Sequence, residues 1–343
     1  MKALFALFFF LSCLCCHAET ANQIPPPPEN LPIKVYTGFR LIRLISIDER
    51  EETFKANIYL TFKWEDPRLT FTPQNGEIAK VYLEDAVSDK FKEIWWPQLE
   101  YKNTDRPTFN NQTLLIFPDG KVEYYVGLTA KFRFLANFKR FPFDTQTLPV
   151  FVDSFIWSDN YVVFVPDSKA ISKPEEVAES TAQIITNISE SSFTVAEPEL
   201  IPLNGSGNYS MYSASILIKR NFYYFISQIM VPIFILLMIC FPVFLDYEAP
   251  FIHKLLVNVS CFLALVAIKF AVAVDLPHIS YMTILDKFFL VGYCFVGTAV
   301  LVNFIHLKLE TKRPIYVQRM NRYAPWVLLV LFVISVASIM LFS

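Results

Sequence analysis

Four long apolar segments near the end of the chain constrain its fold more than any other feature of the sequence. Each has about the roughly 20 residues that a helix needs to cross the hydrocarbon of a bilayer. The segments are 222–245, 252–274, 283–307 and 324–342. The sequence therefore predicts a transmembrane domain of four helices over residues 221–343.

The first residues have the features of a secretion signal. Lys2 is followed by an apolar run over residues 3–14, and small side chains precede a cleavage point after Ala18. An uncleaved anchor helix is the alternative, but this run is too short to cross a bilayer. We therefore predict a signal peptide over residues 1–18 and an exported domain over residues 19–220.

The predicted topology agrees with the distribution of charge. With the N-terminus outside, four crossings return the C-terminus to the outside, so the loop 308–323 is cytoplasmic. Cytoplasmic loops are rich in Lys and Arg, and this loop has one acid, Glu310, against Lys308, Lys312, Arg313, Arg319 and Arg322. The chain is predicted to be a multi-pass protein of the plasma or inner membrane.

Charge and cysteine positions exclude several classes of function. The formal net charge of the 343 residues is −2, so there is no electrostatic reason to expect a nucleic acid partner. The exported part has no cysteine, which excludes thiolate metal sites and disulfides there. No Gly-rich phosphate loop or metal-ligand spacing is present. We expect no cofactor, no metal site and no enzymatic activity.

The exported part has the pattern of β-strands. Its strand-like stretches are rich in β-branched and aromatic residues and are separated by Pro, Gly, Asn and Asp. They cover 33–47, 53–64, 122–134, 146–152 and 209–219. The predicted fold is an extracellular antiparallel β-sandwich followed by a four-helix transmembrane bundle.

Five motifs in order resemble those of the pentameric ligand-gated ion channels. They are Trp64-Glu65-Asp66 with Arg68-Leu69, Trp95-Trp96-Pro97, Phe141-Pro142-Phe143-Asp144, Arg220 at the head of the first apolar segment, and Pro232 within it. The family's signature disulfide would fall near Phe134 and Leu148, where this chain has no cysteine. The chain is therefore similar to the prokaryotic-type members, and its motifs most resemble those of the amine-gated bacterial channel.

The resemblance implies a homopentamer with an agonist site between neighbouring subunits. One subunit would contribute Glu100, Tyr101, Asn103, Asp153, Phe155, Phe193 and Tyr209, and its neighbour Tyr59 and Thr61. Aromatic faces attract an ammonium by about 0.5–2 kcal/mol each, and Glu100 or Asp153 can supply a counter-charge. A small amine is the expected agonist, and protons are the alternative opening signal. A further alternative is that these aromatic residues belong to the ordinary core and these acids to the surface, with no role in binding.

The second apolar segment carries a stripe suited to line a pore for monovalent ions. Positions at helical spacing are Leu256, Ser260, Leu263, Ala267, Phe270 and Val274. Rings of apolar side chains can stop ions by excluding water, so we expect the closed gate at Leu263 and Phe270. The alternative is that the stripe is only one apolar face of an apolar helix.

Ion selectivity is less well specified by the sequence. Cation-selective relatives have an acid at the inner mouth, where this chain has His253-Lys254. We expect cation selectivity, with Lys254 turned away from the pore axis. Anion selectivity is the alternative, because a ring of lysines facing the axis would favour anions. Lys269 lies one position off the stripe, where we expect it to reach the outer vestibule or the subunit interface.

A charged joint is expected where the two domains meet. The resemblance places Arg220, Asp144 and the acidic turn after the first strand near the linker 276–282, which follows the pore helix and contains Pro277. The acids of that turn are Asp48, Glu49, Glu51 and Glu52. Because an Arg at a poorly hydrated boundary needs a carboxylate, we predict that Arg220 pairs with Asp144 or Asp48. An Arg that reaches the lipid headgroups is the alternative. A non-conducting receptor or adhesin is the alternative for the whole chain.

Overall fold

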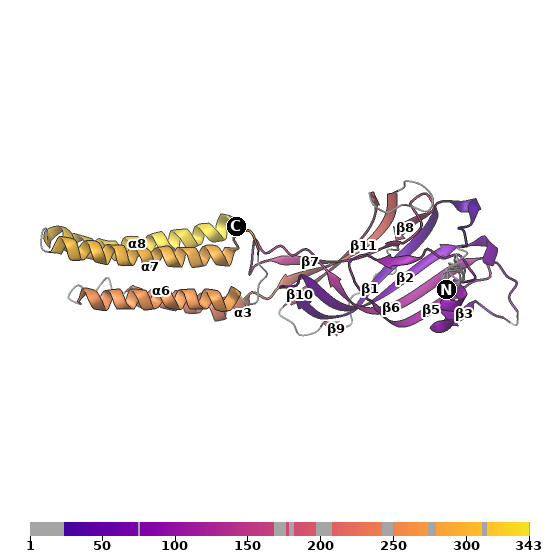
Figure 1. Cartoon of the computed structure of the whole chain (residues 1–343), viewed down its shortest axis with the longest axis horizontal. Helices are drawn as coiled ribbons and strands as arrows, with labels where there is room; N and C mark the ends of the chain where they lie inside the picture. Colours follow the sequence, from indigo (N-terminus) through magenta and orange to yellow (C-terminus); the bar gives the residue numbers. More distant parts are fainter. Residues whose placement is uncertain are drawn as a thin grey trace, which may run out of the picture.

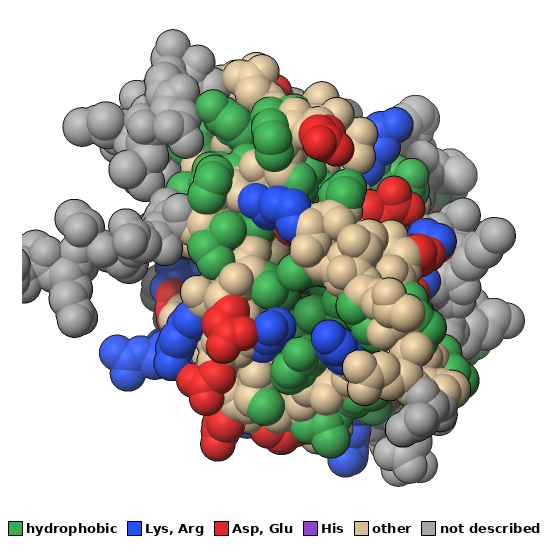
Figure 2. Space-filling view, turned by 90° about the vertical axis from the view of Figure 1, so that its right-hand side faces the viewer, with side chains coloured by type: hydrophobic (Ala, Val, Ile, Leu, Met, Phe, Trp, Pro, Cys, Tyr) green, Lys and Arg blue, Asp and Glu red, His purple; other side chains and the backbone are tan. Residues whose placement is uncertain are grey.

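The computed structural model of the chain describes residues 24–74, 76–167, 176–177, 182–196, 208–241, 250–273, 279–310 and 314–342. A β-rich half and a helical half lie end to end along the longest axis of the molecule (Figure 1). The predicted signal peptide lies outside the described residues. Seen from the end opposite the helices, basic and acidic side chains are interspersed with apolar ones (Figure 2).

Two sheets form the β-rich half. The first has the order β3-β5-β6-β2-β1-β8, with β9 added beside β1, and the second has the order β10-β11-β7-β4. The strands are β1 (Ile33–Asp48), β2 (Thr53–Glu65), β3 (Lys80–Leu83), β4 (Leu99–Tyr101), β5 (Thr108–Ile116), β6 (Lys121–Arg133), β7 (Thr145–Ser154), β8 (Val162–Pro166), β9 (Glu176–Val177), β10 (Ala182–Ala196) and β11 (Asn208–Arg220). Most pairings are antiparallel, as predicted, but β1 pairs in parallel with β8 and β9.

Alternation along the strands produces the core between the sheets. In β2, Ile58, Leu60 and Phe62 are fully buried, whereas the intervening Tyr59 and Thr61 face away from the core. Successive side chains of a strand point to opposite faces, so this pattern makes one face of β2 apolar. The core also holds Trp95 and Tyr212 of other segments. Burying one such side chain contributes about 1.5–3 kcal/mol, which suits a domain without disulfides.

Short helical turns join the strands of this half. They are η1 (Pro28–Asn30), η2 (Pro67–Leu69) and α2 (Asp85–Phe91). Asp66 caps η2, because its Oδ1 accepts hydrogen bonds from the backbone and the Nε of Arg68 at 3.1 and 2.9 Å. The Trp-Glu-Asp and Arg-Leu pieces of the first motif thus meet in one tight turn. The motif thus stabilises this turn.

The helical half contains α3 (Tyr223–Phe225), the π-helical turn η3 (Ile226–Met230), α4 (Val231–Cys240), α6 (Phe251–Ala273), α7 (Ile284–Glu310) and α8 (Pro314–Phe342). The π-helical turn ends two residues before Pro232, which cannot donate a backbone hydrogen bond to the preceding turn. By length and composition, α6 and residues Ile284–Leu309 of α7 can each cross a membrane. Ile226–Cys240 and Tyr323–Ile339 are shorter apolar helices.

Most of the predicted loop 308–323 is helical, which differs from the expectation. Helix α7 continues to Glu310 and α8 begins at Pro314. Proline is favoured at the first position of a helix because its missing N–H needs no partner there. The polar first turns of α8 therefore continue directly into the fourth apolar segment.

A second apolar core holds the helices together and includes part of the β-rich half. Phe138 and Phe141, from the loop between β6 and β7, are fully buried in it. Their neighbours in this core include Ile233 of α4, Leu265 of α6 and Phe289 of α7. The Phe-Pro-Phe-Asp motif thus inserts into the end of the helical bundle.

Candidate functional site

The outer face of the four-stranded sheet aligns residues predicted to bind the agonist. The register pairs Glu100 of β4 with Asp153 of β7, Asp153 with Met211 of β11, and Met211 with Phe193 of β10. Tyr209 follows on the same face of β11, because it is two positions from Met211. For Phe193 only the backbone lies within the described structure. Four neighbouring strands thus place these positions in one row.

Lys102 occupies the centre of the acidic part of this row. Its Nζ lies 2.9 Å from Glu100 Oε2 and 3.4 Å from Asp153 Oδ2. Asp153 is almost fully buried, with 1% of its side chain exposed, whereas 37% of the Glu100 side chain is exposed. The two carboxylates expected to balance an agonist ammonium are therefore already paired with an ammonium of the protein.

Tyr101 and Asn103, which were predicted to contact the agonist, make contacts inside their own subunit. Tyr101 pairs across the sheet with Val152 and packs against the sandwich core, so it faces away from Glu100. Burial raises the pKa of the Tyr101 phenol well above its ordinary value. The amide nitrogen of Asn103 donates to the backbone oxygens of Arg133 and Pro149 at 2.9 and 2.7 Å. Asn103 thus ties β6 to β7.

Phe155 is exposed, whereas Tyr59 and Thr61, which were predicted on the neighbour's side of the site, are partly buried. Phe155 follows β7, and 59% of it is exposed. Tyr59 and Thr61 lie on the outward face of the seven-stranded sheet. The ring of Tyr59 crosses Gly127, where an added Cβ would approach Tyr59 Cδ2 to 3.3 Å. Burial raises the pKa of the Tyr59 phenol despite the opposing effect of Arg40.

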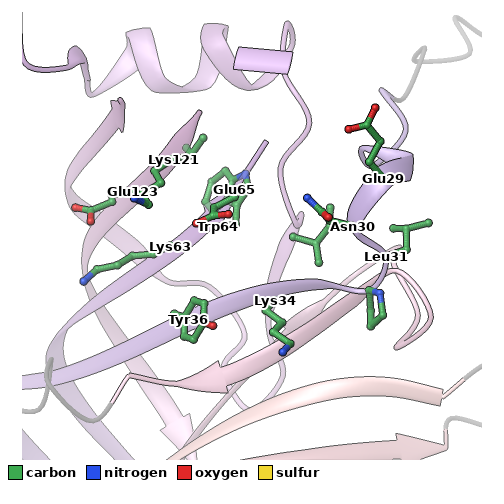
Figure 3. A pocket seen from close by; sticks show the side chains of 13 residues that line it. Glu29, Asn30, Leu31, Lys34, Tyr36, Lys63, Trp64, Glu65, Lys121 and Glu123 are labelled. Atoms are coloured by element: carbon green, nitrogen blue, oxygen red, sulfur yellow. The ribbon is translucent and has the colours of Figure 1, made fainter. Parts of the chain in front are cut away.

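The predicted residues lie on or beside two different sheets. A cavity of about 710 Å³ opens elsewhere, between the start of β1, the end of β2 and the start of β6 (Figure 3). Lys34, Tyr36, Lys63, Glu65 and Glu123 are among its lining residues. Its lining includes none of the residues predicted to bind the agonist.

The predicted pore stripe lies on the exposed side of α6. Leu256, Leu263 and Phe270 are 58%, 61% and 71% exposed, and Ser260 and Ala267 are exposed as well. Val274 lies outside the described residues. The opposite side of α6, with Lys254, Asn258, Cys261 and Leu265, is buried against the other helices. The stripe is thus available to line a shared space.

The two lysines of α6 have different surroundings. Lys254 is 6% exposed and turns toward the interior of the bundle, away from the stripe. Lys269 lies 3.4 Å from Asp286 Oδ1 of α7. Asp286 also caps α7, because Oδ2 accepts hydrogen bonds from the backbone N–H and hydroxyl of Thr283. Lys269 therefore links α6 to the start of α7 and leaves 44% of its side chain exposed.

Arg220 forms the centre of the junction between the two halves. Its Nε and Nη2 donate to the Asp144 carboxylate at 2.6 and 3.0 Å, and its Nη1 donates to Glu49 at 2.5 Å. Its guanidinium lies over the rings of Phe141 and Phe225 at 4.7 and 5.5 Å. Burial by itself would lower the pKa of Arg220, but the two carboxylates outweigh it and raise that pKa.

The pairing of Arg220 with Asp144 matches the first of the two predicted partners, and Asp48 makes a different contact. Asp48 Oδ1 accepts a hydrogen bond from the backbone of Glu51 at 3.0 Å and so stabilises the turn after β1. That turn presents the next residue, Glu49, to Arg220. Pro277 lies outside the described residues.

Two hydrogen bonds fasten the loop between β6 and β7 to the helical half. The backbone N–H of Phe138 donates to the Tyr281 hydroxyl at 2.9 Å. The backbone N–H of Leu285 donates to the carbonyl of Phe141 at 3.3 Å. Together with the apolar insertion, these contacts connect the β-rich half to the segment before α7.

Three contact residues were not predicted from the sequence as parts of the site: Lys102, Tyr281 and Asp286. Lys102 carries a usable signal, because strand alternation places it on the same side as Glu100. Asp286 follows Thr283 by three residues, which is the spacing of a helix capping box. Tyr281 is revealed only by a contact between distant segments. Glu49 was expected at the joint, but not as a partner of Arg220.

Comparisons with known proteins agree with this architecture. The neurotransmitter-gated ion-channel ligand-binding domain matches residues 20–222, more than half of the chain. A proton-gated ion channel of Gloeobacter violaceus is 29% identical over 309 residues, which cover 88% of this chain and 81% of that protein.

Receptor subunits of animals are also similar. The gamma-aminobutyric acid receptor subunit rho-1 of Mus musculus is 25% identical over 294 residues, covering 82% of this chain and 58% of that subunit. Subunit beta-4 of Gallus gallus is 24% identical over 288 residues, covering 80% of this chain and 56% of that subunit. The chain spans just over half the length of these receptor subunits. It belongs to the pentameric ligand-gated ion channel family and is a channel subunit, not an enzyme.

Proposed function

We propose that the protein forms a homopentameric channel that a small amine opens and that conducts monovalent cations. The observation that carries the agonist class is the row on the outer face of the four-stranded sheet. Glu100 and Asp153 supply two carboxylates there. Two aromatic residues belong to the same region: Tyr209, which is 4% exposed and lies two positions from Met211, and Phe155, which is 59% exposed and follows Asp153 by two positions. Carboxylates together with aromatic faces bind an organic ammonium better than either alone.

The second half of the agonist site comes from the neighbouring subunit. Tyr59 and Thr61 lie on the outward face of the other sheet, so they complete the site only when a second copy presents that face. A repeated head-to-tail contact of this kind closes into a ring. Five-fold closure would give five equivalent sites.

The exposed stripe of α6 supports a pore that conducts cations. Lys254 is buried on the opposite side of the helix, so a ring of lysines would not face the ions at the inner mouth. Apolar rings at Leu263 and Phe270 would exclude water in the closed state, which blocks ions without filling the pore. Binding of the agonist would open these rings through the Arg220 junction.

Gating by protons is the second candidate. It is favoured by the similarity to a channel whose name states that protons gate it. Protonation of a carboxylate would then replace agonist binding as the opening signal. The two candidates share the same pore and junction.

Current measurements on the purified channel in a lipid bilayer test both candidates. A panel of primary monoamines and diamines at constant pH should open the channel, and a pH step without amine should not. Channels that ignore every amine and open on the pH step alone would overturn the amine assignment. The reversal potential under a NaCl gradient should follow the sodium equilibrium potential; a reversal near that of chloride would instead mean anion selectivity.

A further inference from the structure

We propose that the side-chain ammonium of Lys102 lies where the ammonium of an amine agonist binds, so that the agonist must displace it. This inference rests on the proposed amine site. It identifies Lys102 as a residue that determines how much amine, and which amine, opens the channel. The inference begins from the ion pairs on the outer face of the four-stranded sheet.

The position of Lys102 is set by the backbone on which it stands. It follows β4 directly, and its N–H donates to the carbonyl of Phe151 in β7 at 3.2 Å. This bond holds the start of the side chain beside the row formed by Glu100 and Asp153. The ammonium then lies between the two carboxylates, 2.9 Å from one and 3.4 Å from the other.

The charges explain why the ammonium of Lys102 lies at this position. Only 1% of the Asp153 side chain is exposed, and an ionised carboxylate at such a site needs a cation close by. Lys102 supplies that cation. The two carboxylates therefore share one ammonium of the protein.

An incoming amine would carry the same charge as the group that it replaces. The exchange would leave the charge balance of the buried acid unchanged, so the contacts of the ammonium with carboxylates add little net affinity. The agonist's advantage must therefore come from contacts of its carbon skeleton, for example with the exposed ring of Phe155. The lysine side chain has a flexible four-carbon stem and a strongly hydrated head, and 23% of it is already exposed, so it can move out into water.

A purely structural role for Lys102 predicts a different result. If Lys102 only stabilised the sheet, its removal would lower the number of assembled channels and leave the amine concentration for half-maximal current unchanged. If Lys102 competes with the agonist, its removal changes that concentration. Restoring a cation at the same place should then reverse the change.

The test uses Lys102→Cys in the full-length channel, with currents measured against the concentration of a primary monoamine such as propylamine. The half-maximal concentration should fall about tenfold, the scale of one charge-assisted contact. Attachment of an aminoethyl group through a disulfide should return it to the parent value. Attachment of a neutral methylthio group should not.

Two controls separate this effect from side reactions. Parent channels treated with the same reagents control for Cys294, which is exposed on α7. Lys92→Cys is the second control, because Lys92 is 76% exposed and pairs with Asp89 on the surface. Its half-maximal amine concentration should equal that of the parent before and after treatment with either reagent. If Lys102→Cys does not assemble, Lys102→Arg is used instead, because it keeps the charge. The arginine guanidinium binds carboxylates through two N–H groups and therefore more tightly, so the half-maximal amine concentration should rise.

The outcomes distinguish this inference from the amine assignment. A parent channel that opens with amines, together with an unchanged or higher half-maximal concentration in Lys102→Cys, would overturn the role of Lys102 and leave the amine site standing. So would an Arg variant that responds to lower amine concentrations than the parent. A response to amines in Lys102→Cys but not in the parent would support the inference. Amine-insensitive parent and variant channels that open on a pH step would overturn both.

Discussion

At the scale of single residues, the best-defined part of the molecule is the environment of Arg220. It makes bonds to two carboxylates and lies over two aromatic rings, although the partners are far apart in the sequence. Its pKa is raised, so it stays charged at every physiological pH. Changes of pH in that range therefore act on the channel through other groups.

We expect that Arg220→Lys retains assembly but weakens the coupling between agonist and pore. Lysine keeps the charge but loses the paired bonds to Asp144. Arg220→Ala should be more severe, because it leaves Asp144 buried without its cation, at a cost of about 3–5 kcal/mol. Agonist binding should be nearly unchanged in Arg220→Lys while the maximal current falls, as measured by ligand binding and by currents on the same sample.

A matched control for this prediction is Arg133→Ala. Arg133 also pairs with an aspartate, Asp105, at 2.8 Å, but both side chains are exposed. Exposed ion pairs contribute about 0–1 kcal/mol, so this variant should show normal currents and thermal stability. Normal currents in Arg220→Lys and Arg220→Ala would contradict the role assigned to Arg220.

At the scale of elements, α6 shows how one apolar helix can serve two purposes. Its buried side includes Lys254 and Asn258, whereas the exposed side is apolar around Leu263 and Phe270. A soluble helix would have the reverse arrangement. The polar groups face the other helices of the bundle, and the apolar stripe is exposed, as the proposed pore requires.

Replacing Leu263 by serine should make the channel easier to open. A hydroxyl ring holds water better than a leucine ring, so the closed constriction loses part of its barrier. We expect the agonist concentration for half-maximal current to fall about tenfold, with more current in the absence of agonist. Concentration–response curves measured on both channels would detect this change.

Leu301→Ser in α7 is the control for the gate. Leu301 is 62% exposed, against 61% for Leu263, so both substitutions place a hydroxyl at an equally exposed position of an apolar helix. The response of Leu301→Ser should resemble that of the parent. An unchanged response in Leu263→Ser, or equal shifts in both variants, would count against a gate at Leu263.

At the scale of the whole molecule, the β-rich half meets the helices through the Phe-Pro-Phe-Asp loop, Arg220 and the segment before α7 (Figure 1). The predicted halves of the agonist site lie on different sheets of one subunit. In the proposed channel, the binding site and the pore each need several copies of the chain.

We expect the purified protein in detergent to have five times the mass of its mature chain. Native mass spectrometry or light scattering corrected for bound detergent would measure the stoichiometry. Monomers that bind amines with the same affinity as the pentamer would contradict a site shared between subunits. A stable assembly of another size would contradict the five-fold pore.

The sequence by itself determined the properties that depend on local patterns. Apolar runs of membrane-crossing length, alternation within strands such as β2, and the motif around Phe141 were sufficient to predict the two-part fold and its family. These signals arise because burial acts on each segment separately. The spacing of Leu256 to Phe270 likewise sufficed to predict one face of α6.

The tertiary structure decided between Asp144 and Asp48 as partners of Arg220, and it alone showed the other charged groups that meet. Asp144 and Glu49 lie 76 and 171 positions from Arg220, and Lys102 neutralises acids on two strands. Asn103 and Tyr101 have residue types suited to a binding site, yet their side chains hold strands together or face the core. Ion pairs and hydrogen bonds act over a few ångströms, so their partners are decided by how distant segments pack, which no local pattern records.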